Sequence, residues 1–163
     1  MSYASLSSTP GLNYNYSLYA VPVGWLIGMV PLWWAIGQAK SESPSSFNNA
    51  NPQDSWANLK NTKIAPRLRG RIQRAVAANN NTHVNLPLFA ASLVAANVAH
   101  VPAKVLHIAA AGWLISRVIY TFAYILIEDP KLALFRSLTY FAGVISCLAL
   151  FVSAAGKYAS VPW

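Results

Sequence analysis

Arginine and tyrosine residues stand inside a long apolar stretch of the sequence. Arg117, Tyr120 and Tyr124 lie within the stretch from Val105 to Ile127. Their spacing of three and four residues places them on one face of a helix. A cation and two phenols in a segment of lipid-spanning length are costly unless they face protein or a water-filled cavity. These residues are therefore candidates for a functional site.

A second polar stripe opens the next apolar stretch. Arg136, Ser137 and Tyr140 follow an acidic turn at Glu128-Asp129-Pro130. Arg136 and Tyr140 share a helix face because they are four residues apart. Two such stripes on consecutive helices can face each other across a narrow gap. Since each contains an arginine, the sequence predicts a binding site for an anionic ligand at the edge of a membrane.

The composition indicates an integral membrane protein. Hydrophobic residues make up 55% of the chain and charged residues only 10%, against about 25% charged in a soluble domain. The formal charge is +8, and seven of the twelve Lys and Arg residues fall between Lys40 and Arg74. This clustering is typical of a cytoplasmic loop of a membrane protein. We therefore expect the lipid bilayer as a partner and no nucleic acid.

The apolar stretches predict an all-α fold, an integral membrane four-helix bundle that forms a single domain over residues 1–163. The segment 40–66 is rich in Ser, Asn and Pro, and we expect a loop with too little apolar area to order itself. This basic loop faces the cytoplasm, so the turn near Pro130 shares its side and both termini face the other side. The expected helices cover approximately 18–38, 67–101, 105–127 and 132–155.

Histidine and cysteine do not indicate a metal site or a reactive thiol. His83 has no second ligand at metal-binding spacing. Cys147 lies in an apolar stretch and has no cationic neighbour in sequence that would lower its pKa. We expect no bound metal, and a buried, inert thiol.

Two segments resemble the third and fourth helices of a known family nearly residue for residue: Arg117-Val118-Ile119-Tyr120-Thr121-Phe122-Ala123-Tyr124 and Arg136-Ser137-Leu138-Thr139-Tyr140. The family is the membrane-associated proteins in eicosanoid and glutathione metabolism (MAPEG), which includes the microsomal glutathione transferases. The resemblance covers most of the chain from Arg67 to Ala155. It implies a homotrimer in the endoplasmic reticulum membrane, with glutathione bound between neighbouring subunits in a site that faces the cytoplasm.

The resemblance also implies roles for single residues. Arg136 matches an arginine near the glutathione sulfur that is proposed to stabilise the thiolate, because a fixed cation in a low-dielectric site favours the charged form of an acid. Ser137 and Tyr140 match polar positions at the reactive end, so these three are the candidate catalytic residues. Arg117 matches an arginine with a structural or ligand-facing role. The candidate glutathione-binding residues are Asn81, Asn85, Arg117, Tyr120, Tyr124 and Arg136.

The segment before these helices departs from the family pattern. Family members that use glutathione have an arginine, an asparagine four residues later and a glutamate three residues after that. Here Asn81 keeps the asparagine, whereas Ala77 and Val84 replace the arginine and the glutamate. That glutamate receives the ammonium group of the γ-glutamyl moiety. Its loss should weaken glutathione binding by about 1.5–3 kcal/mol, or roughly ten- to a hundred-fold.

Three functions are open on the sequence alone. The first is a membrane glutathione transferase or peroxidase in which Arg136 stabilises a thiolate that attacks lipophilic electrophiles from the bilayer. The second is the same scaffold repurposed as a glutathione-independent isomerase or cyclase for a hydrophobic metabolite, which the changes at Ala77 and Val84 motivate. The third is a noncatalytic membrane interaction protein in which Arg117 and Arg136 bind lipid phosphate.

Overall fold

The computed structural model describes residues 14–160, with the side chains of Pro130 and Ala133 excepted. No strand occurs within this range, so the predicted all-α class is confirmed. Short 3-10 turns precede α1, flank α2 and join α4 to α5. The α-helices are α1 (Ala20–Glu42), α2 (Pro52–Ala57), α3 (Pro66–Val98), α4 (Ala103–Leu126) and α5 (Ala133–Ala159).

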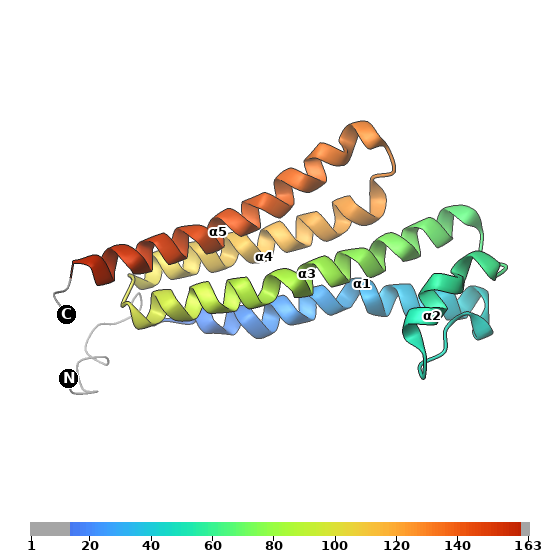
Figure 1. The fold of residues 1–163 in the computed structure, drawn as a ribbon, viewed down its shortest axis with the longest axis horizontal. Coiled ribbons are helices and arrows are strands. Elements are labelled where there is room, and N and C mark those ends of the chain that lie inside the picture. The colour runs from blue at the N-terminus through green and yellow to red at the C-terminus, as the bar shows by residue number, and fades with distance from the viewer. Residues whose placement is uncertain (1–13, 161–163) are drawn as a thin grey trace.

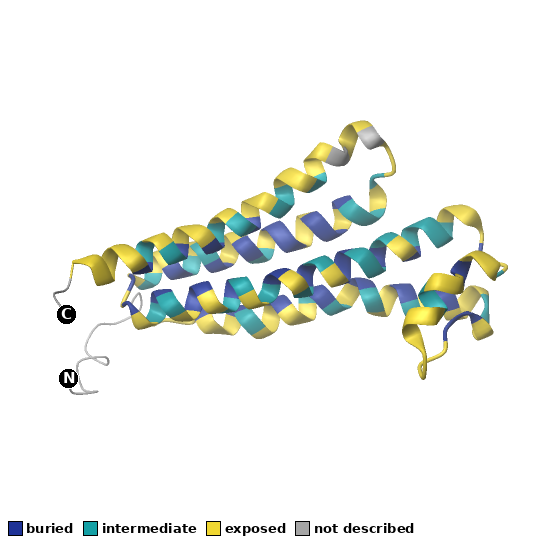
Figure 2. Cartoon of the chain, in the orientation of Figure 1, coloured by how far each residue is buried: buried dark blue, intermediate teal, exposed yellow. Residues whose placement is uncertain are grey.

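The four long helices lie side by side as a bundle (Figure 1). α1 packs mainly on α3, α4 packs mainly on α5, and α3 also contacts α4 and α5. Buried positions face the seams between the helices, whereas the outer faces are exposed (Figure 2). At the centre, the rings of Phe89 and Trp113 stack with centroids 4.2 Å apart. Leu93 of α3 and Leu150 of α5 complete this fully buried core.

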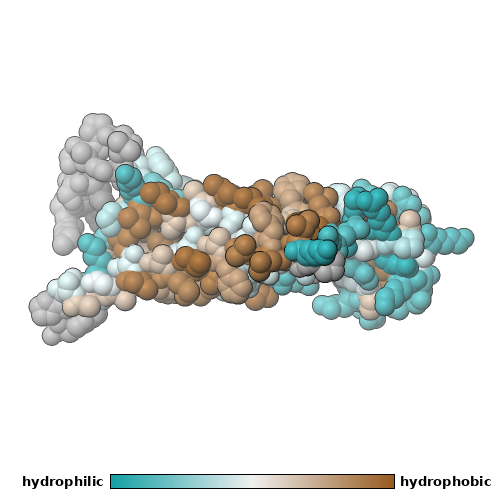
Figure 3. Space-filling model, turned by 90° about the horizontal axis from the view of Figure 1, so that it is seen from above, coloured by the Kyte–Doolittle hydropathy of each residue, from teal (hydrophilic) through white to brown (hydrophobic). Residues whose placement is uncertain are grey.

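The two ends of the bundle differ in polarity. α2 and the turn between α4 and α5 lie at one end, away from the end where α5 finishes (Figure 1). The surface at the α2 end is hydrophilic, and a largely apolar band covers the middle of the molecule (Figure 3). Glu128 in the turn lies 4.0 Å from Arg67, 3.8 Å from Arg71 and 2.9 Å from Arg74. The basic segment and the acidic turn therefore meet at one end of the bundle, as the sequence predicts.

Three helical segments of the described chain are long and apolar enough to cross a membrane, namely Ser17–Glu42, Ala103–Leu126 and Leu134–Ala159. The expected fourth span, α3, does not meet this criterion although it is the longest helix. The reason is its polar content, which includes four arginines in its first three turns and a run of asparagines. Asn79, Thr82 and Asn85 are nevertheless buried against neighbouring helices. A window average of hydropathy does not register this burial.

The prediction of an unordered loop over residues 40–66 is wrong. α1 extends to Glu42 and α2 forms within the segment, so the bundle has five α-helices among its described residues rather than four. Leu59 and Ile64 are buried and pack against the adjoining ends of α1 and α3. Phe47 is also buried and its ring contacts that of Trp56. A few apolar residues spaced through the polar run are therefore enough to fold it onto the helix ends.

Two helix ends also differ from the prediction. α3 ends at Val98 rather than near residue 101, because His100 adopts a left-handed conformation with φ of 55°. The amide of Val101 donates to the carbonyl of Ala96 at 3.0 Å, which is the hydrogen bond of a left-handed helix cap. α5 continues to Ala159, four residues beyond the predicted end.

The bundle geometry predicts that α3 crosses the membrane. In that case the segment carrying α2 and the end of α5 lie on opposite membrane faces. We expect Ser55→Cys and Ser160→Cys, each made in a Cys147→Ala background, to react with a membrane-impermeant maleimide from opposite sides of sealed vesicles. Permeabilised vesicles should label both variants. Labelling of both from the same side would mean that the chain crosses only three times.

Candidate functional site

A pocket of about 630 Å³ lies beside the first two turns of α5. It brings together five of the eight candidate site residues, from two helices that are consecutive in the chain. Leu134 and Phe141 add apolar walls that sequence reasoning did not single out. The five candidates that line it are Tyr120 and Tyr124 of α4 and Arg136, Ser137 and Tyr140 of α5.

Arg136 presents an available cation to this pocket. Its guanidinium carbon lies 5.0 Å from the centroid of the Tyr124 ring, a contact worth about 0.5–1 kcal/mol at a partly exposed site. The Tyr124 ring in turn packs against that of Tyr120 at 5.3 Å. Within residues 14–160 the Arg136 guanidinium makes no hydrogen bond and no ion pair. Stacking therefore orients the side chain while its N–H donors stay available for an anion.

Asn81 and Asn85 support the pocket from behind and do not line it. The Asn81 amide donates to the Tyr120 hydroxyl at 2.7 Å, and the Asn85 amide donates to the Tyr140 hydroxyl. Each phenol oxygen thus accepts a hydrogen bond from α3. A hydroxyl that accepts in this way keeps its own O–H as a donor. Together with Arg136, Tyr120 and Tyr140 give the pocket a set of hydrogen-bond donors suited to an anionic ligand.

Arg117 is fully buried and does not line the pocket. Its Nη2 donates to the backbone carbonyl of Tyr140 at 2.7 Å and lies 3.5 Å from that of Thr139. Its guanidinium carbon is also 5.2 Å from the Tyr120 ring and 5.6 Å from the Trp113 ring. The side chain therefore links α4 to α5. Of the two roles that the resemblance leaves open for it, the geometry favours the structural one.

This fold and pocket can be compared with known proteins. The sequence model of the MAPEG family matches residues 18–156. The chain belongs to the MAPEG family. Comparisons with curated proteins and with solved structures find no match. Membership implies a membrane function of the glutathione transferase or eicosanoid-metabolism type, and MAPEG proteins generally use glutathione.

The α3 positions that depart from the family pattern given by the resemblance offer no carboxylate to an ammonium group. Val84 lies on the outer face of α3 and is 74% exposed. Arg74 is the nearest cation before Ala77, and it is already bound, because its guanidinium donates to the Ile125 carbonyl at 3.0 Å and to Glu128 at 2.9 Å. The four acidic residues of the chain stand at positions 42, 54, 128 and 129. None therefore lies within α3, α4 or α5 of this MAPEG protein.

Gly143 is a supporting residue that the sequence analysis did not single out. A Cβ atom at this position would lie 2.5 Å from Ser116 Oγ and 2.6 Å from Arg117 Nη2. Real Cβ atoms do not approach so closely, so the buried guanidinium occupies the space that glycine leaves on α5. The signal in the sequence was a glycine in one apolar helix and an arginine inside the preceding one. The sequence gives no means of pairing the two.

We expect Gly143→Ala to lower the stability of the detergent-solubilised protein by about 1–3 kcal/mol, because the added methyl displaces Arg117 or Ser116. The matched control is Gly156→Ala on the same helix, where nothing lies within 4 Å of the added Cβ. That control should be neutral or slightly stabilising, since alanine is the better helix former. Thermal unfolding followed by circular dichroism measures both. Equal melting temperatures for the two variants would contradict the close packing of Arg117 on Gly143.

Proposed function

We propose that this MAPEG protein is a membrane-bound glutathione transferase or peroxidase in which Arg136 stabilises the glutathione thiolate. The observation that carries the proposal is the unpaired Arg136 guanidinium beside Ser137 and Tyr140 in the pocket. Guanidinium is charged throughout the physiological pH range. A fixed cation next to a bound thiol favours the thiolate, which is the nucleophilic form.

The proposed transferase reaction needs only groups that the pocket contains and the two substrates. The thiol proton leaves to solvent, and the sulfur electron pair then forms a bond to the electrophilic atom of the second substrate. The leaving group departs with its own electron pair, and the O–H groups of Ser137 and Tyr140 can donate hydrogen bonds to it. In the peroxidase case the sulfur attacks the terminal peroxide oxygen, and the alkoxide that leaves takes a proton from solvent. A second glutathione then reduces the glutathione sulfenic acid, which gives glutathione disulfide and water. Arg136 acts by holding the thiolate before attack.

A lipophilic second substrate is favoured by the pocket's apolar walls. Leu134 and Phe141 line it and are both exposed on the outer surface of α5. Because α5 is long and apolar enough to span a membrane, these side chains border acyl chains. An electrophile dissolved in the bilayer can therefore reach the pocket without passing through water.

The homotrimer that the resemblance implies is supported by one face of α3. Along this face the exposed residues recur at alternating intervals of four and three, which is the spacing of a helix–helix seam. Asn81 and Asn85, which hold the pocket phenols, adjoin Val84 on this seam, so a neighbouring copy packed there would border the pocket. The basic segment between α1 and α3 favours a pocket facing the cytoplasm. The endoplasmic reticulum as the membrane concerned is an implication of the resemblance alone. The exposed seam residues are Asn80, Val84, Pro87, Ala91, Val94 and Val98.

A second candidate function is favoured by the missing carboxylate at Val84. The same donors would bind an anionic or carbonyl-bearing hydrophobic metabolite without any ammonium partner, as a glutathione-independent isomerase or cyclase requires. A copurified hydrophobic ligand in the pocket, together with no glutathione turnover, would favour this function over the first.

We expect Arg136→Gln to lower kcat/KM for glutathione conjugation to a chlorinated nitrobenzene by about a hundred-fold, because it removes a preorganised charge at the reacting sulfur. The matched control is Lys131→Gln, which removes one exposed positive charge just before α5 and outside the pocket. That control should keep wild-type activity. The ultraviolet absorbance of bound thiolate should fall in Arg136→Gln alone. No turnover by the wild type at millimolar glutathione would contradict the proposal.

We expect Val84→Glu to tighten glutathione binding by roughly ten- to a hundred-fold, because it restores a carboxylate for the ammonium group. Val84→Gln is the matched control, because glutamine has the shape of glutamate without its charge. It should change the affinity for glutathione far less. Isothermal titration with the purified protein measures both. Micromolar binding by the wild type, unchanged in Val84→Glu, would show that the missing carboxylate has no importance here.

A further inference from the structure

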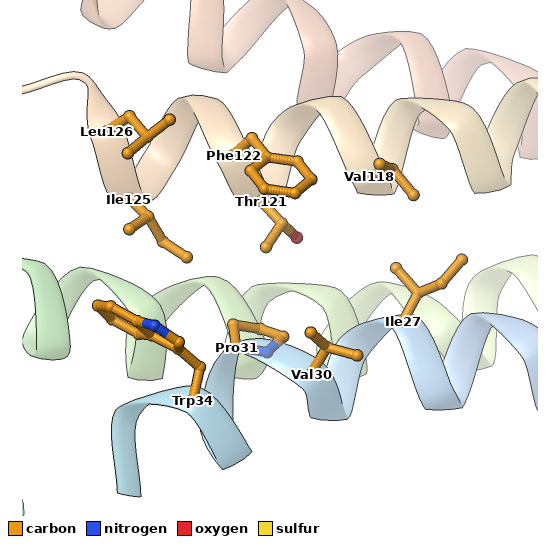
Figure 4. A pocket seen from close by; sticks show the side chains of 9 residues that line it. All are labelled: Ile27, Val30, Pro31, Trp34, Val118, Thr121, Phe122, Ile125 and Leu126. Carbon is orange, nitrogen blue, oxygen red and sulfur yellow. The ribbon is translucent and has the colours of Figure 1, made fainter. Parts of the chain in front are cut away.

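A second pocket, of about 380 Å³, lies between α1 and α4 on a different face of α4 from the Arg136 pocket. Figure 4 shows side chains of α1 opposite those of α4, with α3 behind them. Val30, Phe122 and Leu126 line it and are exposed on the outer surface of the bundle. The full lining is Ile27, Val30, Pro31, Trp34, Val118, Thr121, Phe122, Ile125 and Leu126.

The walls of this pocket are almost wholly apolar. Their one hydroxyl, Thr121 Oγ1, is buried and has no hydrogen-bond partner among the described residues. A wall of this kind cannot bind a polar ligand at lipid depth, but it accommodates an acyl chain. Since each buried methylene contributes about 0.8 kcal/mol on transfer from water, and little on transfer from lipid, the apolar wall alone gives no selectivity in a bilayer. Any selectivity must come from a polar group next to the pocket.

Such a polar group adjoins the end of the pocket at Leu126. Three arginines of α3, Arg67, Arg71 and Arg74, surround the single carboxylate of Glu128, two residues beyond Leu126. The Arg74 guanidinium also donates to the carbonyl of Ile125, a residue of the pocket wall. The cluster is therefore in direct contact with the pocket and holds three cations against one carboxylate.

Arg67 and Arg71 are the two members of this cluster without a hydrogen bond in the described chain, and Arg71 lies one helical turn closer to Arg74, which contacts the pocket wall. The Arg71 Nε is buried and has no hydrogen-bond partner in the described chain, and the nearest Glu128 oxygen lies 3.8 Å away. The side chain is 35% exposed, so an incoming anion can reach it. A guanidinium binds phosphate through two parallel N–H donors. Arg71 is thus the residue of the cluster best placed to receive a phosphate.

We propose that the α1–α4 pocket and the arginine cluster together bind one anionic phospholipid. Its acyl chain fills the pocket between α1 and α4, and its headgroup phosphate lies on Arg71. A phospholipid matches both parts of this site. Its acyl chain matches the apolar pocket at lipid depth, and its anionic headgroup matches the arginines at the hydrophilic end of the bundle (Figure 3). Basic pockets at the ends of membrane helices bind such headgroups. This lipid site is independent of the proposed reaction at Arg136.

Fluorescence quenching of Trp34 tests the proposal directly, because this ring is part of the pocket wall (Figure 4). The protein is reconstituted in phosphatidylcholine vesicles with increasing fractions of phosphatidic acid that carries brominated acyl chains. The Trp34 signal is the difference between wild type and Trp34→Phe. We expect quenching that saturates at a low fraction of brominated phosphatidic acid. Brominated phosphatidylcholine should quench only in proportion to its fraction.

Arg71→Gln should raise the half-saturating fraction about five-fold, as expected for the loss of one basic side chain next to the headgroup. The matched control is Arg69→Gln, which removes the same charge on the same helix from a side chain that donates to the Lys60 carbonyl instead. That control should leave the half-saturating fraction unchanged. Val118→Phe fills the pocket, and it should abolish saturable quenching even if Arg71→Gln fails to fold.

Four results would each overturn the proposal. Equal quenching by the anionic and the zwitterionic brominated lipids would show a nonselective apolar surface. An equal effect of Arg69→Gln and Arg71→Gln would show diffuse attraction to surface charge. Saturable quenching by a brominated free fatty acid, without any by the phospholipid, would assign the pocket to a different ligand. Full quenching in Val118→Phe would place the brominated chains outside the pocket.

Discussion

The buried guanidinium of Arg117 is the interaction on which the rest of this bundle depends. An unpaired charge at this depth costs several kcal/mol. Removing the partner of a buried charge therefore destabilises the fold by more than the contact itself stabilised it. Arg117 is stable there because its Nη2 binds the carbonyl of Tyr140 at 2.7 Å and aromatic rings surround it. Gly143 leaves the necessary space on α5. The position of α5 relative to α4 follows from these contacts, and with it the position of every pocket residue that α5 carries.

The two lipid-depth arginines thus have different roles. Arg117 is enclosed and donates from Nη2 to backbone carbonyls, so it does not reach a ligand in the pocket. Arg136 instead stacks on Tyr124 and keeps its donors available. From α3, Asn81 and Asn85 complete the pocket by fixing two phenols as donors. A pocket that offers donors and a cation, in helices without a carboxylate, favours ligands that are purely anionic. Under the proposed function, the thiolate end of a glutathione site would therefore be better kept than the ammonium end.

Helical periodicity was sufficient to predict part of this arrangement from the sequence. Residues three or four apart must share a face, so Tyr120 with Tyr124, and Arg136 with Tyr140, were predictable as groups. Periodicity does not show which arginine faces a pocket and which is enclosed, because that depends on the contact between Arg117 and Gly143 of another helix. Composition likewise underestimated the order of the segment 40–66. Its apolar residues are few, but Leu59 and Ile64 pack against the ends of α1 and α3. The burial of asparagines in α3 could not be predicted either, because it depends on contacts with neighbouring helices that composition does not show.

Amide hydrogen exchange measured by mass spectrometry tests the role of Arg117 most directly. Wild type and Arg117→Met are compared in the same detergent. If the guanidinium holds α5 on α4, residues 134–144 should exchange roughly ten- to a hundred-fold faster in the variant, as expected for the loss of a hydrogen bond to a charged group. Residues of α1 and the first half of α3 should exchange at the wild-type rate. Unchanged exchange over 134–144 would contradict the account.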